Sequence, residues 1–335
     1  MMACRTSSAV ARSWLWPLAG LLLLLAFNGI FAPGFFRLAF VEGRLVGNPV
    51  HIAVQSSKII LVAIGMTLVI ATKGVDLSVG SVMAISGSTA AVLAAAGASF
   101  PSLFAASLAA GAAVGLTNGL LVAGLRIQPI VATLIFMVLG RGVAMLIAGG
   151  QPRPIQNETL LFLGSGHFWI LPLPPLLALA ALLATAAVVR FTPLGLFIAA
   201  AGSNETAARL AGLPAARIKA LVYTFSGIAA ACAGLIAAAR VETADPSRLG
   251  ELVELDAIFA VVVGGTALTG GRFSLAGSLA GALLIQTLTL TMINQGMPPE
   301  ITPVPKALVI VAVCLLQSGE FRKRAAGLFR RPAAA

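Results

Sequence analysis

Apolar runs of about twenty residues recur along this chain, and short polar segments that hold most of its charges separate them. An α-helix of that length spans the hydrocarbon core of a bilayer. Glycine and serine weaken the pattern in two of the runs, 76–97 and 254–271. About ten transmembrane helices are predicted, near residues 14–32, 51–71, 76–97, 102–124, 127–148, 171–191, 218–239, 254–271, 274–294 and 303–318.

The composition agrees with a chain that lives in lipid. Of its 335 residues, 59% are hydrophobic and 10% are charged, whereas about a quarter of a soluble chain is charged. We therefore expect an all-α integral membrane protein. It forms one membrane-spanning domain over 1–335, with its transmembrane region at 14–318 and a basic tail at 319–335.

The net charge of +11 raises the question of nucleic-acid binding, but the basic residues lie at the ends of apolar runs and in the tail. That arrangement is typical of the positive-inside rule. With the N-terminus in the cytoplasm, fourteen Lys and Arg fall on the inner side and five on the outer side, which predicts that both termini are cytoplasmic. The inner residues are Arg5, Arg12, Lys73, Arg126, Arg190, Arg209, Arg217, Lys219, Arg272, Arg322, Lys323, Arg324, Arg330 and Arg331, and the outer ones are Arg37, Arg44, Arg153, Arg240 and Arg248.

Residues that carry enzymatic chemistry are missing from the sequence. Cys4, Cys232 and Cys314 are far apart, and His51 and His167 are the two histidines, so neither a disulfide framework nor a metal site is indicated. No phosphate-binding loop and no nucleophile motif occurs. We predict no cofactor, no metal and no catalytic residue, and expect that this chain does not itself hydrolyse ATP.

Small residues predict how some helices pack. Gly111, Gly115 and Gly119 repeat every four residues, as do Gly277 and Gly281, and such spacing lets helix backbones approach closely. Ser107–Ala109 and Ser274–Ala276 share the letters Ser-Leu-Ala. This similarity indicates an internal repeat of two halves, a common design in transporters.

The inner segment 192–217 has the signals of a short surface helix. Ser203 or Asn204 can cap it, Glu205 suits its first turn, and Gly212 suits its end, so a helix is expected over 204–211. Ala207 and Ala208 would give it a shallow profile that another protein can approach closely. Among the outer segments, 149–172 is rich in proline and predicts an ordered but non-helical loop or a short re-entrant piece, and 241–251 contains the turn signal Asp245-Pro246.

Acidic residues are rare, and three of them accompany apolar runs: Asp76, Glu254 and Asp256. A carboxylate in a membrane is normally placed for a reason, such as a gate, a pathway or a bond between helices. A cap or an ion pair with a nearby cation explains them as well, and we favour that structural role. The deeper polar residues, such as Asn118 and Gln128, are neutral and compatible with a sugar route.

Three long motifs resemble the permease subunits of ribose- and galactose-type ATP-binding-cassette importers. They are Ile64–Thr72 followed by Val75–Ser81, Ala201–Asn204 followed by Ala207–Gly212, and Glu254–Ile258 followed by Val262–Gly265 and Gly270–Arg272. Ile127–Pro129, Val131–Ile135, Gly140–Ala144 and Pro298–Glu300 resemble the galactofuranose branch of this family. Lys73 departs from the pattern, because the family usually has glycine there.

The resemblance implies a mechanism. Two permease chains would share a pathway for a monosaccharide (galactofuranose or a related pentose or hexose), a periplasmic protein would deliver the sugar, and cytoplasmic ATP-binding subunits would dock on the 202–212 segment. The coupling residues implied are Gly202, Asn204, Ala207, Ala208, Arg209 and Gly212. The candidates for the pathway or its gate are Asp76, Ser78, Asn118, Gln128, Glu254 and Asp256.

Two other classes of protein remain as alternatives. A secondary sugar carrier driven by an ion gradient would need neither an ATPase nor a binding protein, and would lose activity when Asp76 or Asp256 is neutralised. A membrane-embedded enzyme that acts on lipid-linked sugars would need a cluster of acids or histidines, which this sequence lacks.

Overall fold

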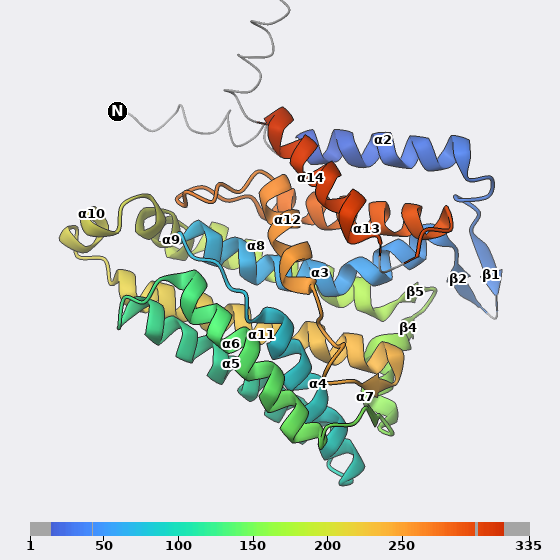
Figure 1. The fold of residues 1–335 in the computed structure, drawn as a ribbon, viewed down its shortest axis with the longest axis horizontal. Coiled ribbons are helices and arrows are strands. Elements are labelled where there is room, and N and C mark those ends of the chain that lie inside the picture. Colours follow the sequence, from blue (N-terminus) through green and yellow to red (C-terminus); the bar gives the residue numbers. More distant parts are fainter. Residues whose placement is uncertain (1–14, 42, 299–300, 318–335) are drawn as a thin grey trace, which may run out of the picture.

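The computed structural model describes residues 15–41, 43–298 and 301–317, and this part of the chain is almost entirely α-helical (Figure 1). The basic tail lies outside the described residues. The helices are α2 (Leu15–Phe31), α3 (Asn48–Ala71), α4 (Val79–Ala95), α5 (Phe100–Ala123), α6 (Pro129–Ala148), α7 (Glu158–Ser165), α8 (Leu173–Phe191), α9 (Leu194–Ser203), α10 (Glu205–Leu210), α11 (Ala215–Val241), α12 (Val253–Val263), α13 (Leu275–Asn294) and α14 (Pro303–Gln317).

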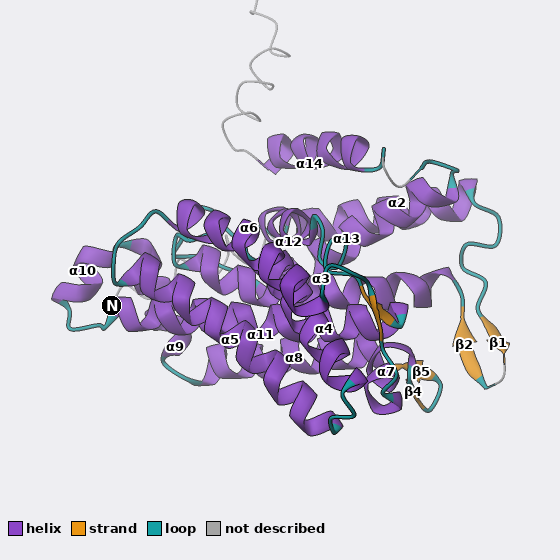
Figure 2. Ribbon diagram, turned by 60° about the horizontal axis from the view of Figure 1, so that its bottom comes forward, coloured by secondary structure: helices purple, strands orange, loops and turns teal. Residues whose placement is uncertain are grey.

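Short strands join some of the loops in antiparallel pairs. These pairs are β1 (Ala39–Val41) with β2 (Arg44–Val46), β3 (Arg153–Pro154) with β6 (Thr243–Ala244), and β4 (His167–Phe168) with β5 (Leu171–Pro172). The β1–β2 and β4–β5 hairpins lie at one end of the helical bundle, and α10 lies at the other (Figures 1 and 2). We call these the hairpin end and the α10 end.

Helix α3 forms the centre of the bundle. Within its most apolar stretch 83% of the residues are buried, compared with 22% in α6 and in α8, which lie at the periphery. Helix α3 packs against α8, α11, α12 and α13. It runs antiparallel to α11, because Gly65 lies against Ser226 while Val54 and Arg240 line one cavity nearer the hairpin end.

The small-residue faces predicted from the sequence are confirmed. Gly111, Gly115 and Gly119 of α5 lie against the backbone of α11, so closely that a Cβ atom at any of them would overlap it. Gly277 and Gly281 of α13 lie in the same way against α12. Close backbone approach increases van der Waals contact where lipid supplies no hydrophobic drive for association.

Each of the ten apolar runs predicted from the sequence overlaps one helix of the structure. By length and composition, six helices of the described chain can cross a membrane on their own, namely α3, α5, α6, α8, α11 and α13. Helices α2 and α4 are apolar but have 17 residues each.

The predicted run 254–271 becomes a much shorter helix. Helix α12 ends at Val263, because Gly264 lies directly against Gly277 and Gly265 takes a positive φ of 87°. Its 11 residues extend about 16 Å, which is less than the thickness of a bilayer core. Residues 264–274 therefore continue without helix toward the α10 end.

Two loops contain helices that the sequence analysis did not predict. For the segment 149–172 the sequence predicts a non-helical loop or a short re-entrant piece. The non-helical alternative is wrong, because the segment contains α7, which begins after Asn157, where the Asn157 side chain accepts a hydrogen bond from the Leu160 amide. Helix α9 precedes the predicted surface helix. That surface helix is confirmed as α10, with Asn204 as its N-cap and a positive φ of 82° at Gly212.

Candidate functional site

A buried carboxylate joins two parts of the bundle. Asp76, in the turn between α3 and α4, is 1% exposed. Its Oδ1 accepts hydrogen bonds from the Ser78 amide (3.1 Å) and hydroxyl (2.6 Å), and its Oδ2 accepts one from the Ser226 hydroxyl of α11 (2.8 Å). Hydrogen bonds to a carboxylate are stronger than those between neutral groups, so this residue fixes the α3–α4 turn on α11.

A second layer of polar groups surrounds this carboxylate. Asn118 of α5 donates from Nδ2 to Ser78 Oγ (2.9 Å), and the Tyr223 hydroxyl lies 3.4 Å from the Val75 carbonyl oxygen. The structure thus brings together three of the predicted pathway residues, Asp76, Ser78 and Asn118. It encloses them between helices, and none of the three lines either of the polar cavities described below.

The two acidic residues of α12 have separate surroundings. Glu254 is 9% exposed and lies against Gly80, and its Oε2 accepts no hydrogen bond from the described residues. Asp256 forms an ion pair with Lys306 of α14, with Nζ 2.9 Å from Oδ1 and 3.2 Å from Oδ2. Residues two positions apart on a helix point in nearly opposite directions, which explains the difference.

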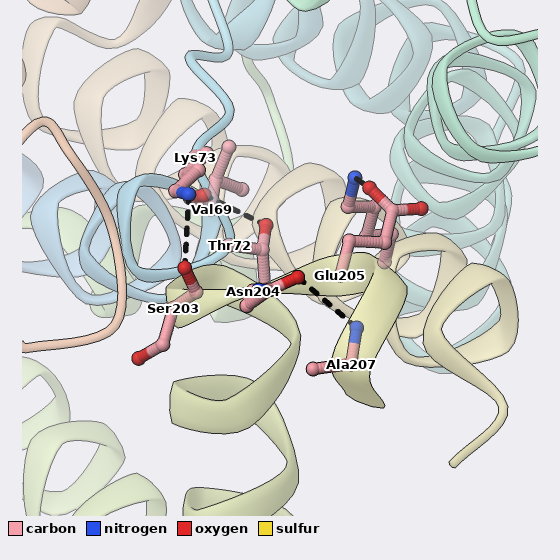
Figure 3. A network of polar contacts seen from close by, with 8 residues as sticks. Val69, Thr72, Lys73, Ser203, Asn204, Glu205 and Ala207 are labelled. Carbon is pink, nitrogen blue, oxygen red and sulfur yellow. Dashed lines mark hydrogen bonds and ion pairs between the residues drawn. The ribbon is translucent and has the colours of Figure 1, made fainter. Parts of the chain in front are cut away.

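At the α10 end, Lys73 connects the α3–α4 turn to α9. Its Nζ donates to the Ser203 carbonyl oxygen (3.1 Å), and the Asn204 side chain next to it caps α10 by accepting from the Ala207 amide (3.0 Å; Figure 3). Lys73 has a φ of 64°, in the left-handed region where glycine is usual. This backbone conformation is one that glycine adopts without strain, which agrees with the glycine that the family resemblance leads us to expect at this position.

Three segments meet around Gly202. A Cβ atom at this position would overlap the Ala71 carbonyl oxygen at the end of α3. The same oxygen accepts a hydrogen bond from the Gly271 amide (2.9 Å), and Gly270 lies against Lys73. The three sequence motifs that end or begin here therefore form one contact surface at the α10 end, although 69 to 200 residues separate them in the chain.

A basic cavity of about 380 Å³ opens beside α10. Glu205 at its edge accepts an ion-pair contact from Lys219 (2.6 Å). Gln128, another predicted pathway residue, lies here and not with Asp76. The polar residues that line the cavity are Lys73, Arg126, Gln128, Glu205, Thr206, Arg209 and Lys219.

A larger cavity of about 900 Å³ extends from the hairpin end into the bundle between α3, α4 and α11. Lys58 of α3 and Arg240 of α11 line it together. Sequence reasoning did not select either residue, although a lysine inside an apolar run was a usable signal. The other polar residues on its wall are Gln55, Thr243, Asp245, Arg248 and Glu251.

Comparison with known proteins places the chain among transport proteins. The family described as the permease component of branched-chain amino acid transport systems matches residues 48–314. The galactofuranose transporter permease protein YtfT of Escherichia coli K12 is 46% identical over 92% of both chains. The fructose import permease FruF of Bifidobacterium longum is 37% identical over 95% of this chain and 91% of its own.

Two further matches were found. The ribose import permease RbsC of Escherichia coli K12 is 37% identical over 92% of this chain and 95% of its own. A solved structure of a metal-chelate type ABC transporter in an inward-facing conformation covers 91% of this chain and all of that chain, at 17% identity and a TM-score of 0.49. Nothing below rests on that structural similarity.

Proposed function

This chain belongs to the family of transport permeases described as the permease component of branched-chain amino acid transport systems, and from that membership we propose its function. It is the membrane-spanning subunit of an ATP-binding-cassette importer that carries a monosaccharide across a bacterial inner membrane. As a permease component it is a non-catalytic, multi-pass membrane protein. A separate cytoplasmic subunit hydrolyses ATP, and a periplasmic protein delivers the sugar.

The substrate class follows from relatives that share most of their length with this chain. The three relatives named above carry, by their names, galactofuranose, fructose and ribose. All three substrates are monosaccharides, and the relative that is 46% identical is the galactofuranose permease. We therefore assign a pentose or hexose, with galactofuranose as the reference sugar.

The α10 end is the coupling surface for the ATPase. Gly202, Asn204, Ala207, Ala208, Arg209 and Gly212 make up this segment. Ala207, Arg209 and Leu210 are exposed, with Leu210 at 86%, whereas Ala208 is buried against the bundle. An exposed apolar residue flanked by small and charged ones is a suitable contact for another protein. The single observation that carries the proposal is the shared contact around Gly202. A push on α10 would pass through α9, where Gly202 lies against the end of α3 and against Gly271 of the 264–274 segment.

The orientation follows from the charge distribution. We place the α10 end in the cytoplasm and the hairpin end in the periplasm, with both termini cytoplasmic and ten membrane segments. Helices α2, α4, α12 and α14 are too short to cross alone at full thickness, and neighbouring helices and non-helical segments such as 264–274 complete their passage. Such backbone is tolerated at membrane depth where protein covers it.

The packing pattern supports an internal repeat. Helix α11 packs against α4 and α5, and α3 packs in the same way against α12 and α13. Helices α4 and α5 contact one another, as do α12 and α13. Because α3 and α11 run in opposite directions, we infer that residues 48–148 and 215–317 form two inverted repeats.

Two copies of the chain would form the transport pathway between them. The enclosed groups Asp76, Ser78 and Asn118, together with Glu254, would then act at the points where helices shift. Gln128 and Asp256 would lie at opposite ends of the helices that move. In this arrangement the permease has two conformations, and the ATPase determines which of them is populated.

Reconstitution tests this function against the alternative of an ion-driven carrier. The permease is placed in proteoliposomes with its ATPase and its binding protein, and uptake of labelled monosaccharides, both neutral sugars such as galactofuranose and uronic acids, is measured with and without ATP. We expect uptake that requires all three proteins and ATP. Uphill uptake by the permease alone on a proton or sodium gradient would establish the secondary carrier instead.

A further inference from the structure

The cavity at the hairpin end holds cations that the folded chain does not neutralise. Lys58 is the eleventh of the 24 residues of α3, about 15 Å from the start of the helix, and therefore lies at the level of the bilayer interior. Among the described residues, no hydrogen-bond acceptor and no ion-pair partner engages the side chain of Lys58, Arg240 or Arg248. A cation at this depth is costly unless it has a partner or a function.

Charges of both signs act on Lys58. The attraction of Asp256 is the strongest of them, and Arg240 and Lys306 each repel Lys58 more weakly. Asp256 is already bound to Lys306 by two short contacts. Lys58 and Arg240 therefore face one cavity with like charges and without an acceptor of their own.

The carboxylates of the same cavity do not compensate this charge. Asp245 lies in the turn after β6, and its Oδ1 accepts from the Ser247 hydroxyl (2.6 Å) and amide (2.9 Å). The hydrogen bond from the Ser247 hydroxyl is the main reason why the pKa of the Asp245 carboxyl is below its usual value. Glu251 is exposed at the rim. The cavity wall thus carries three cations, Lys58, Arg240 and Arg248, and two carboxylates, Asp245 and Glu251, which gives it a net charge of +1. This excess positive charge lies toward the inner part of the cavity.

We propose that this cavity binds an anionic monosaccharide, a sugar acid whose single carboxylate pairs with Lys58 and Arg240. Gln55, one turn before Lys58 on α3, supplies an amide donor and acceptor for sugar hydroxyls. The cavity volume of about 900 Å³ lies within the range of small-molecule sites and accommodates a sugar ring with its water. A neutral sugar would enter the same space and leave both cations unpaired.

This inference rests on the proposed function, because it assigns the substrate class to the same importer. Uptake is therefore measured in proteoliposomes with the complete importer, using a labelled neutral hexose and its uronic acid in parallel. We expect ATP-dependent uptake of the uronic acid at least tenfold above that of the hexose. ATP-dependent uptake of the hexose alone would overturn this inference and leave the proposed function intact, whereas no ATP-dependent uptake of either would overturn both.

Substitutions of charged residues test whether the preference for the sugar acid depends on Lys58 and Arg240. We expect Lys58→Met to reduce uptake of the uronic acid at least tenfold, Arg240→Gln to reduce it similarly, and Lys58→Arg to retain most of it. Arg44→Gln, on the exposed β1–β2 hairpin at the same end, is the matched control and should change nothing. An equal loss for acid and neutral sugar in Lys58→Met would contradict the proposal.

A chemical probe tests the cavity without the binding protein. In a variant with Cys4, Cys232 and Cys314 replaced by serine, Lys58→Cys is exposed from outside to a negatively charged and a positively charged methanethiosulfonate reagent. We expect at least fivefold faster labelling by the anionic reagent, and protection by the uronic acid but not by the hexose. Equal rates, or protection by the neutral sugar alone, would refute an anion site.

Discussion

Lys73 holds a left-handed backbone conformation (φ 64°) and at the same time donates a hydrogen bond of 3.1 Å to the Ser203 carbonyl oxygen. The left-handed conformation costs a non-glycine residue about 1–2 kcal/mol, and the charged hydrogen bond offsets part of that cost. The chain thus has a side-chain link between the α3–α4 turn and α9 that a glycine cannot make. That link lies inside the contact surface around Gly202.

Two substitutions at Lys73 separate strain from contact. Lys73→Gly removes both the strain and the hydrogen bond, so we expect a thermal midpoint close to that of the parent protein. Lys73→Ala keeps the strain and removes the bond, and should be less stable than Lys73→Gly by about 1 kcal/mol. Thermal unfolding in detergent measures the difference, and a more stable alanine variant would show that the backbone strain is not real.

A bulky residue at Gly212 should separate ATP hydrolysis from transport. Gly212 has a φ of 82° and open space around it, so the side chain of Gly212→Trp would occupy the surface on which we propose that the ATPase docks. We expect normal membrane insertion, continued ATP hydrolysis and at least a tenfold loss of uptake. Gly97→Trp is the matched control, because Gly97 has a φ of 75° and equally open space after α4. Normal uptake by Gly212→Trp would contradict the coupling role.

Loss of the buried carboxylate should weaken the bundle. In Asp76→Ala, the hydroxyls of Ser78 and Ser226 lose their shared acceptor, so we expect a loss of about 2–3 kcal/mol in unfolding free energy. Asp76→Asn retains one acceptor and should lose less. In proteoliposomes, uptake by both variants should remain independent of a proton or sodium gradient. If the protein were an ion-driven carrier, both variants would instead lose their gradient-driven uptake.

The Lys306–Asp256 pair should show coupling in a double-mutant cycle. Its side chains are 12% and 20% exposed, so removing one partner leaves the other charge only partly solvated. We expect Lys306→Met or Asp256→Asn to cost about 1–2 kcal/mol each, less than for a fully buried pair. The double variant should lose less than the sum of the two. Strict additivity would mean that the pair contributes nothing.

The assigned orientation can be read with two reporters. A reporter fused after Ala335 should be cytoplasmic, and a reporter inserted in the β1–β2 turn at Gly43 should be periplasmic. Gly43 has open space around it, so the insertion does not disturb packing. If both reporters were on the same side of the membrane, the proposed topology would be wrong. If the reporter after Ala335 were periplasmic and the one at Gly43 cytoplasmic, the protein would have the opposite orientation.

Local pattern was enough to predict much of the fold. The ten apolar runs, the glycine faces of α5 and α13 and the Asn204 cap all depend on residues within one or two helical turns, so the sequence displays them directly. The early end of α12 was not predictable in this way, because Gly264 stops the helix through its contact with Gly277 on another element.

The polar partners could not be predicted for a similar reason. Asp76 was selected from its sequence neighbourhood, but its bond to Ser226 joins residues 150 positions apart. Lys58 lies within an apolar run of the sequence, but whether it faces Arg240 depends on how α3 packs against α11. Sequence pattern identifies which residues are unusual in a membrane, and tertiary packing determines what faces them.

The pairing of Arg153–Pro154 with Thr243–Ala244 has a consequence for movement. It attaches the chain that leaves α6 to the chain that leaves α11, and so joins the two halves that we propose as inverted repeats, at the surface that we place in the periplasm. Backbone hydrogen bonds tolerate little stretching, so we expect this point to act as a pivot during transport. Spin labels beside it should keep a constant separation while labels on α10 change theirs with each nucleotide state.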